Sequence, residues 1–548
     1  MESRTENPSN PPHDRPAKII DRYFEELMRL TYEHPLLMRN LVRVAGVSSL
    51  ALLTAPWWSP SLGMDFSVGA SAAAVAVGAV GALASGVTSF MQNRFFGLPA
   101  NDDTSVYHES EFNWQSGMAK IHLEDGGMPC LIIRSDQPYD AGYVEGYILG
   151  EAIKHNLAVT DFLYKPMWLM GAPWSRADIK EYLDAVYAKI PVAYQDEIRG
   201  KVAGYNRWLH EHHPEAKPLA LEYYLLLQLL PDIRNYNPFR KPEKDYAFSM
   251  PTLPNPACTT AVLRLGDYTF FTRVLDWPSY GECGKYFLQM DRRIGEAKWT
   301  IDIGIPLLTG ALTVLNEDGM LIEMNVAHGD KVAEPQGMPA VFFNRYCAEQ
   351  ASCVEEVNHL IAEQKPLGAY HLTASDGKEV QSFHFYQHPE VQGEHAIDIL
   401  DRDTTDPQLL VVANHGLTFK DSVPTIVNHR DSDQRKVNIH HLFSQKAAQD
   451  KFRQFIDKQN QQGEMPQQDL QEMKEFCLQV ARLPLVSNCE SVLCALYVYH
   501  HNKLVDASVA TDNLYAQRKE LDEFKSLPLT QNLWVESCKK RVIFIQNH

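Results

Sequence analysis

The sequence has few cysteines, no excess of positive charge and no glycine-rich nucleotide-binding motif. Nine cysteines are spread without regular spacing over 548 residues, which differs from a dense disulfide framework and indicates a reducing compartment. Acidic residues outnumber basic residues by 69 to 51, so the net charge is −18. That sign repels phosphate backbones, and we expect no nucleic-acid partner. Neither a Walker A nor a Rossmann glycine pattern occurs, and we expect no cofactor.

Signals for secretion, glycosylation and metal binding are also missing. No apolar core follows the first residues, although a signal peptide requires one. The single Asn-x-Ser sequence begins at Asn7 and has proline in its middle position, which prevents glycosylation. The histidines at 210, 212 and 213 match no zinc spacing, so we expect no metal. The protein is therefore not expected to be secreted or lysosomal.

The composition is that of a globular chain with several parts. Apolar residues make up 45% and charged residues 22%, which allows a sizeable core. At about 100–200 residues per domain, this length exceeds one small domain. Shifts in composition predict five regions: a polar lead with an amphipathic helix (1–43), an apolar hairpin (44–93), a linker (94–105), a helical region (106–257) and a catalytic region (258–548).

The apolar hairpin at 44–93 is the first candidate functional segment. Asp65 is its only charged residue, and Phe66 to Met91 gives 26 residues without charge. A helix needs about 20 apolar residues to span a bilayer. Arg43 and Arg94 flank the hairpin, which favours both ends on the cytoplasmic side. We expect membrane association with the catalytic region facing the cytoplasm. The alternative is a buried helical hairpin in a soluble core.

The most informative segment begins NPACTTAV and ends LDWPSYG. Its apolar runs predict two β-strands joined by a two-residue turn at Gly266-Asp267. In that register Cys258 lies opposite Leu275. Arg273 and Asp276 flank this partner, so a thiol, a guanidinium and a carboxylate gather at one end of a hairpin.

This gathering of groups suits nucleophilic catalysis. A thiolate is the nucleophile, and a neighbouring cation lowers the pKa of a thiol. If the chain is cut just before Cys258, the freed α-amine has an ordinary pKa of about 8 and can act as the base. Asp276 would then orient the amine, and Arg273 would orient substrate or stabilise the thiolate. The alternative is a buried cysteine beside a structural ion pair, since free cysteines usually pack as small apolar residues.

The same segment resembles the start of the mature subunit in N-terminal-nucleophile (Ntn) cysteine amidohydrolases of the choloylglycine hydrolase, acid ceramidase and N-acylethanolamine acid amidase type. These families carry Cys-Thr, a hairpin and Arg-x-x-Asp followed by an aromatic residue. The matching residues are Cys258, Thr259, Arg273, Asp276 and Trp277. The resemblance implies a cleavage site between Ala257 and Cys258, and a substrate contact at Trp277.

Later segments continue the resemblance in the same order, over roughly 257–507. The Asn316–Gly319 turn precedes a strand, and the family's catalytic Asn falls on Asn325. The strand LLVVANHG places the oxyanion Asn at Asn414, and RDSDQRKVNIHHL places a functional arginine at Arg435. The segment LPLVSNCESVLCALYVYHHNKL resembles the late strand pair of acid ceramidase. QPYDAGYVEGYILG also resembles penicillin acyltransferase-type and phospholipase B-like relatives.

The resemblance implies an α+β fold, namely the four-layer αββα sandwich of Ntn hydrolases. Region 106–257 would be a largely helical partner that stays bound after cleavage. The implied catalytic set is Cys258, Arg273, Asp276, Asn325, Asn414 and Arg435. Asn325 and Asn414 would donate hydrogen bonds to the oxyanion, and one such donor is worth about 10²–10³ in rate.

The implied activity is hydrolysis of the amide bond of an N-acyl lipid, of the ceramide or N-acylethanolamine class, through an acyl-enzyme on Cys258. Two alternatives stay open. One is an acyltransferase or a phospholipase B-like esterase that uses the same nucleophile. The other is a non-catalytic, membrane-tethered binding module, which the joint presence of the six catalytic-type residues argues against.

Overall fold

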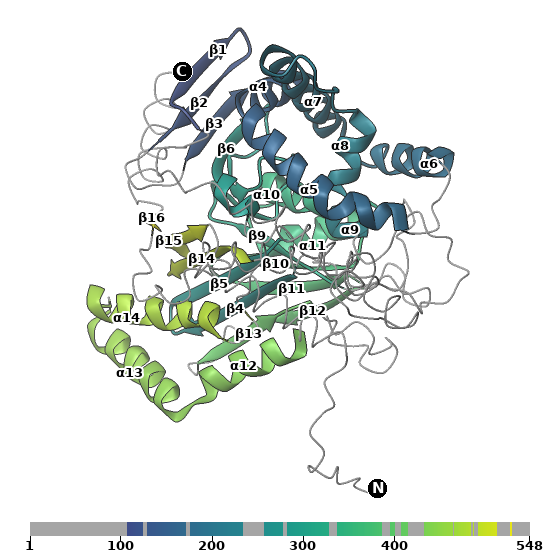
Figure 1. Cartoon of the computed structure of the whole chain (residues 1–548). Helices are drawn as coiled ribbons and strands as arrows, with labels where there is room; N and C mark the ends of the chain where they lie inside the picture. Colours follow the sequence, from purple (N-terminus) through teal and green to yellow (C-terminus); the bar gives the residue numbers. More distant parts are fainter. Residues whose placement is uncertain are drawn as a thin grey trace, which may run out of the picture. The chain divides into compact units, whose positions relative to one another are not determined.

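The computed structural model describes residues 107–123, 129–170, 176–233, 257–277, 282–327, 337–385, 395–400, 407–414, 432–463, 465–483, 486, 491–511 and 527–528 (Figure 1). All of them belong to one of the two compact units of the chain, formed by 106–246 and 254–548. The lead, the apolar hairpin and the linker predicted at 1–105 lie outside the described residues. In the described ranges, no helix is both long and apolar enough to cross a membrane.

The larger sheet, sheet A, has the strand order β1-β2-β3-β6-β7-β8-β9-β10-β11-β12. Its strands are β1 (Ser110–Trp114), β2 (Gly117–His122), β3 (Cys130–Ser135), β6 (Leu288–Ile294), β7 (Thr300–Gly304), β8 (Thr313–Asn316), β9 (Leu321–Val326), β10 (Tyr370–Ser375), β11 (Val380–Phe385) and β12 (His395–Ile399). Neighbouring strands pair antiparallel, except β3 and β6, which are parallel. This parallel pair joins the chain before Cys258 to the chain after it.

The smaller sheet, sheet B, has the order β13-β4-β5-β14-β15-β16. Its strands are β4 (Ala257–Leu265), β5 (Tyr268–Asp276), β13 (Gln408–Val412), β14 (Ser491–His500), β15 (Lys503–Thr511) and β16 (Leu527–Pro528). The predicted hairpin is confirmed. Cys258 pairs with Leu275, and Gly266 in the turn has φ of +57°, which glycine adopts without strain. The predicted late strand pair is β14 and β15.

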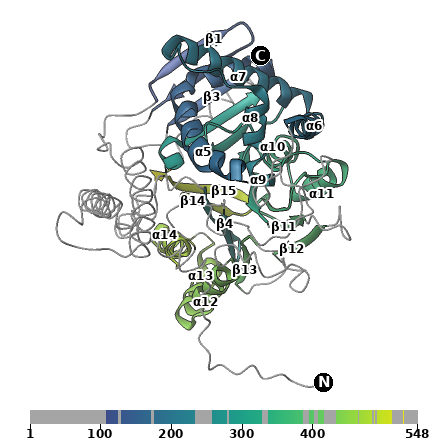
Figure 2. The same ribbon diagram turned by 45° about the vertical axis from the view of Figure 1, so that its right-hand side comes forward.

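Helices cover the outer faces of both sheets. They are α4 (Pro138–Ile148), α5 (Gly150–Met170), α6 (Arg176–Tyr187), α7 (Val192–His212), α8 (Leu221–Gln228), α9 (Leu230–Ile233), α10 (Ala340–Gln350), α11 (Val354–Glu363), α12 (Ser432–Ser444), α13 (Lys446–Gln462) and α14 (Gln467–Leu478). Helix α4 contacts β2 and β3, and α10 contacts β8 and β9. Sheet A meets sheet B through β9 and β4, and α12 to α14 contact sheet B. The order is therefore helices, sheet A, sheet B, helices (Figure 2), and the predicted α+β class is confirmed.

Sheet B and helices α12 to α14 enclose an apolar core. Aromatic rings from both layers meet there, and the Phe270 ring lies 5.9 Å from that of Phe455 in an edge-on arrangement. Phe452 and Phe476 meet in the same way at 5.3 Å. Full burial of one such side chain contributes about 1.5–3 kcal/mol. This core fixes β4 and β5, and therefore the hairpin that carries Cys258.

The region 106–257 is less purely helical than the sequence predicts. Helices α4 to α9 agree with the predicted helical region, and β3 lies on the apolar run CLIIRS. Strands β1 and β2 are additional. The sequence hides them because the side chains of β1 are mostly exposed, which weakens the apolar alternation, and because the turn at 115–116 lacks a glycine or asparagine pair. The region thus supplies three strands of sheet A.

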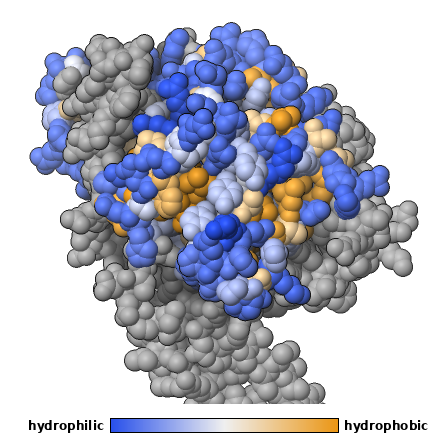
Figure 3. Space-filling view, turned by 90° about the horizontal axis from the view of Figure 1, so that it is seen from above, coloured by the Kyte–Doolittle hydropathy of each residue, from blue (hydrophilic) through white to orange (hydrophobic). Residues whose placement is uncertain are grey.

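Glycines let α4 and α7 pack with their backbones in contact. A Cβ at Gly142 or Gly146 would overlap the backbone carbonyl of Glu197 or Lys201. Gly204 faces α4 in the same way. The glycine face of α4 is therefore a packing seam. Seen from above, this end of the molecule is mostly hydrophilic, with hydrophobic residues between (Figure 3).

Candidate active site

Cys258 is the second residue of β4 and is buried between the two sheets, with 2% of its surface exposed. Alternation along β4 turns Cys258 and Thr260 toward sheet A and Thr259 toward the helices. Two contacts agree with these directions. The hydroxyl of Thr260 donates to Glu323 on β9, and that of Thr259 accepts a hydrogen bond from Arg435 on α12 at 2.5 Å. The thiol therefore lies inside the sandwich.

Arg273 brings a buried positive charge to the thiol. Its Nη2 lies 3.6 Å from Cys258 Sγ and donates to the carbonyl oxygen of Met324 at 2.8 Å. Its Nη1 donates to Glu323 and, at 3.0 Å, to Asn325 Oδ1. Burial alone would lower the pKa of Arg273, but Glu323 and Cys258 raise it above its ordinary value. The guanidinium is thus charged and held where it would stabilise a thiolate.

Glu323 is a site residue that the sequence analysis missed. Its carboxylate is fully buried and accepts hydrogen bonds from Arg273 and Thr260. A signal was present, because glutamate stands alone in the apolar strand LIEMNV, two positions before Asn325. Residues two apart share a strand face, so Glu323 and Asn325 lie on the same face of sheet A, the one that meets sheet B and Cys258. The sequence could not show which cation pairs with this carboxylate.

Asn414 and Arg435 hold the peptide groups of Cys258. Asn414 Oδ1 accepts the backbone N–H of Cys258 at 3.1 Å and a hydrogen bond from Arg435 at 2.5 Å. Arg435 Nη1 donates to the carbonyl oxygen of Cys258 at 2.8 Å. Both residues are buried. The structure thus joins five of the predicted residues in one chain of contacts: Cys258, Arg273, Asn325, Asn414 and Arg435.

The two candidate oxyanion donors are engaged with backbone carbonyls in the intact chain. Asn325 Nδ2 donates to Val412 at 3.0 Å, and Asn414 Nδ2 donates to Val326 at 2.6 Å. The amide oxygens of both face arginine donors, which fixes which way each amide points. An oxyanion role would use the second N–H of each amide, and it stays a prediction.

Asp276 and Trp277 close the end of β5. Asp276 pairs with Ala257 in the hairpin register and accepts a hydrogen bond from Ser491 Oγ at 2.6 Å. Alternation along β5 places Asp276 on the face of sheet B that meets the helices, whereas the thiol lies on the other face. Asp276 is nevertheless beside the peptide predicted to be cut. Trp277 is buried, and its substrate contact stays a prediction.

The site combines two buried arginines, Arg273 and Arg435, with two buried carboxylates, Glu323 and Asp276. Burying charges is unfavourable unless they are paired and hydrogen-bonded. Arg273 contacts the thiol and Arg435 contacts the peptide carbonyl of the same residue, which suits a nucleophile more than a packing residue. Among the described residues, no group of three or more His, Cys, Asp or Glu side chains could hold a metal ion.

Comparisons with known proteins give weak similarities. No family model matches the chain, and no curated protein matches its sequence. A Caenorhabditis elegans ortholog of N-acylethanolamine-hydrolyzing acid amidase is similar over 46% of this chain and 99% of its own, with 12% identity and a TM-score of 0.31. A mutant conjugated bile acid hydrolase from Clostridium perfringens is similar over 46% and 92%, with 10% identity and a TM-score of 0.25. TM-scores this low do not establish a shared fold.

Proposed function

We propose that the chain is a cysteine amidohydrolase of the Ntn type, and that its layers are the αββα sandwich of that group. The contacts of Cys258 support this most. Its thiol lies 3.6 Å from Arg273, and its N–H and C=O are bound by Asn414 and Arg435. Packing a structural cysteine requires none of these contacts. Together they hold one residue by its nucleophilic atom and by both of its peptide groups.

The proposed reaction begins with cleavage of the chain. Cys258 Sγ attacks the carbonyl carbon of Ala257, and its proton passes to the departing backbone nitrogen of Cys258. Water then hydrolyses the thioester and leaves Ala257 as a carboxylate and Cys258 as the new N-terminus. Asn414 Oδ1 already accepts a hydrogen bond from that nitrogen at 3.1 Å, and it would orient the new amine.

The freed enzyme would then act on a substrate amide. The α-amine takes the thiol proton, the sulfur attacks the amide carbon, and the amine returns the proton to the leaving nitrogen. Water resolves the acyl-enzyme. Arg273 stabilises the thiolate, and the second N–H groups of Asn325 and Asn414 supply oxyanion donors. Trp277 would line the substrate site after cleavage.

We propose an N-acyl lipid of the ceramide or N-acylethanolamine class as substrate. The sequence of the 44–93 segment supports this, because a membrane-associated hairpin would bring the site to the surface where such lipids reside. The catalytic region would then face the cytoplasm. A panel of N-acyl lipids, assayed with and without an acceptor amine, separates hydrolysis from acyl transfer. Membrane association predicts that deletion of 44–93 releases the protein from membrane pellets.

The cleavage test compares the wild type with Cys258→Ala. Cleavage before Cys258 divides the 62.2 kDa chain into fragments of about 29 and 33 kDa at an even mass per residue. We expect both fragments in the wild type, with the larger beginning at Cys258 in N-terminal sequencing, and neither in the variant. Fragments in the variant would contradict the proposal. The proposal would also be contradicted if the wild-type chain stays intact and no thiol-reactive acyl probe labels it.

A further inference from the structure

An open hollow of about 530 Å³ lies where β3 and β6 end. Small-molecule sites usually have volumes of about 300–1,000 Å³. The turn between β1 and β2 forms one side of the hollow. None of the described residues that line it belongs to the candidate active site. Four of its lining residues are charged, and they come from the ends of β3 and β6: Arg134, Asp136, Arg293 and Glu296.

The parallel pairing of β3 and β6 sets the two arginines side by side. Arg134 lies in register with Arg293, and the two strands are neighbours about 4.8 Å apart (Figure 1). Alternation turns Arg293 away from α4, because the preceding Arg292 faces α4 and pairs there with Glu145. Arg134 shares the face of Arg293. Like charges this close repel each other, and a bound anion would offset that repulsion.

The two carboxylates come directly after the arginines on the same two segments. Asp136 follows Arg134 by two residues, a step of about 7 Å in an extended chain. Glu296 follows Arg293 by three residues, after a turn at Gly295. Gly295 has φ of +58°, which glycine adopts without strain. The hollow therefore has an arginine pair on the strands and a carboxylate pair beyond their ends.

These charges do not neutralise one another. The side chains of Asp136, Arg293 and Glu296 are exposed, and none of the three forms an ion pair or a hydrogen bond with another described residue. Arg134 is held by the buried ring of Trp299, whose centre lies 4.2 Å from the guanidinium carbon. Such a contact uses the face of the guanidinium, whereas its N–H groups donate in its plane. Three charges are therefore open to a ligand, and the fourth is fixed beside them.

We propose that the hollow binds a zwitterion that carries a phosphate and an ammonium group. One guanidinium already satisfies a carboxylate as a fork, so two adjacent guanidiniums suit the additional oxygens of a phosphate. The carboxylate pair would repel a simple anion, but it would attract an ammonium group attached a few atoms from the phosphate. Phosphoethanolamine has this chemistry, either free or as a phospholipid headgroup. The site does not depend on the proposed amidohydrolase activity.

The test is calorimetry of the full chain with phosphoethanolamine, inorganic phosphate and ethylamine. We expect phosphoethanolamine to bind most tightly. Arg293→Gln should weaken its binding about tenfold or more, because a charge-assisted hydrogen bond is lost. Glu296→Gln should weaken phosphoethanolamine binding without weakening phosphate binding. The matched control is Arg453→Gln, which changes an exposed arginine on α13 and should leave all three affinities unchanged.

Vesicle pelleting distinguishes the two sources of the zwitterion. Vesicles of phosphatidylglycerol are compared with vesicles that also contain phosphatidylethanolamine, and the full chain is compared with its Glu296→Gln variant. A gain in pelleting from phosphatidylethanolamine that the variant loses supports the headgroup. Calorimetric binding without such a gain supports the free zwitterion.

Three results would overturn the proposal. The first is that phosphoethanolamine does not bind the folded wild type. The second is that phosphate binds as tightly as phosphoethanolamine does. The third is that Arg293→Gln and Glu296→Gln both bind phosphoethanolamine as the wild type does. Both side chains are exposed, so we expect both variants to fold, and either one alone carries the test.

Discussion

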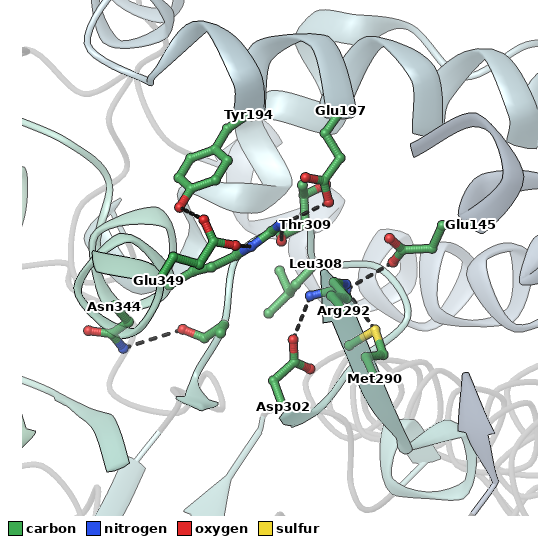
Figure 4. Close-up of polar contacts among 12 residues, drawn as sticks. Glu145, Tyr194, Glu197, Met290, Arg292, Asp302, Leu308, Thr309, Asn344 and Glu349 are labelled. Atoms are coloured by element: carbon green, nitrogen blue, oxygen red, sulfur yellow. Dashed lines mark hydrogen bonds and ion pairs between the residues drawn. The ribbon is translucent and has the colours of Figure 1, made fainter. Parts of the chain in front are cut away.

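Two clusters of buried charged side chains in the described part of the chain differ in which segments they join. The charged residues that surround Cys258 all follow the predicted cleavage point. The second cluster, the bridging network, joins both sides of that point (Figure 4). It consists of Glu145, Glu197 and Lys201 from α4 and α7, and Arg292, Asp302, Arg345 and Glu349 from β6, β7 and α10. One cluster lies around the Cys258 thiol, and the other pairs residues from both sides of the predicted cleavage point.

The bridging network is made of close, buried pairs. Lys201 Nζ lies 2.6 Å and Arg292 Nη2 3.1 Å from Glu145 Oε1. Arg345 pairs with Glu197 and Glu349 at 2.7 Å each. Every pair that crosses the cleavage point adds to the parallel contact between β3 and β6. We therefore propose that fragments cut at 257–258 stay associated.

The largest expected effect comes from Glu145→Gln. The change leaves two buried cations, Lys201 and Arg292, without their shared carboxylate, and breaking a buried pair costs about 3–5 kcal/mol. We expect a loss of this size in the free energy of unfolding by urea, and dissociation of the cleaved fragments on a sizing column. Lys180→Ala breaks only an exposed pair with Asp184 and should change stability by less than 1 kcal/mol. If both variants behave alike, the network does not hold the regions together.

Loss of a charge in the candidate active site should affect self-cleavage as well as stability, unlike loss of a charge in the bridging network. Arg273→Gln tests this difference. The variant leaves Glu323 buried without its cation, so both stability and self-cleavage should fall. Adding Glu323→Gln removes the unpaired charge and should recover about 2 kcal/mol or more of stability. Self-cleavage should not recover, because the thiol still lacks its cation. Urea unfolding and gel-based cleavage rates measure the two effects. Recovery of cleavage in the double variant would contradict the role of Arg273.

Sequence patterns predict the elements that local signals specify. The Gly266-Asp267 turn and the apolar strands beside it placed Cys258 opposite Leu275, as the structure has it. The positions of Asn325 and Asn414 come instead from the family resemblance, and the structure has them at the end of β9 and just after β13. Contacts between segments that are far apart in the sequence could not be predicted from local patterns. Arg345 and Glu197 are 148 positions apart, and Thr260 reaches Glu323 only because two sheets meet. No periodicity encodes such pairings.

Asp302 gives the bridging network a dependence on pH. Burial raises the pKa of Asp302 to about 6 despite the nearby Arg292, so the folded state binds its proton more tightly than the unfolded state. Stability from this group is therefore highest below pH 4 and falls as pH rises from about 4 to about 6. The loss amounts to about 3 kcal/mol.

Asp302→Asn removes that titration. The variant and the wild type should be equally stable near pH 4, and the variant should be the more stable by up to about 3 kcal/mol at pH 7. Urea unfolding at a series of pH values measures the difference. Other groups of the network titrate in both proteins, so the difference isolates Asp302. Equal pH profiles would show that Asp302 is not held in this environment.

The variant with the smallest expected effect tests whether Asp276 takes part in self-cleavage. Ser491→Ala removes the hydrogen bond to Asp276 at 2.6 Å, and we expect a stability loss of about 1 kcal/mol. Because Asp276 lies on the helical face of β5, beside Ala257 and away from the thiol, it would orient the peptide before cleavage and the amine afterwards. Asp276→Asn should then slow self-cleavage far more than Ser491→Ala does. It should leave the rate at which iodoacetamide alkylates Cys258 in the unfolded chain unchanged, as a control. If the two variants slow cleavage equally, the carboxylate acts only through its hydrogen bond to Ser491. Asp276 would then have no role of its own in cleavage.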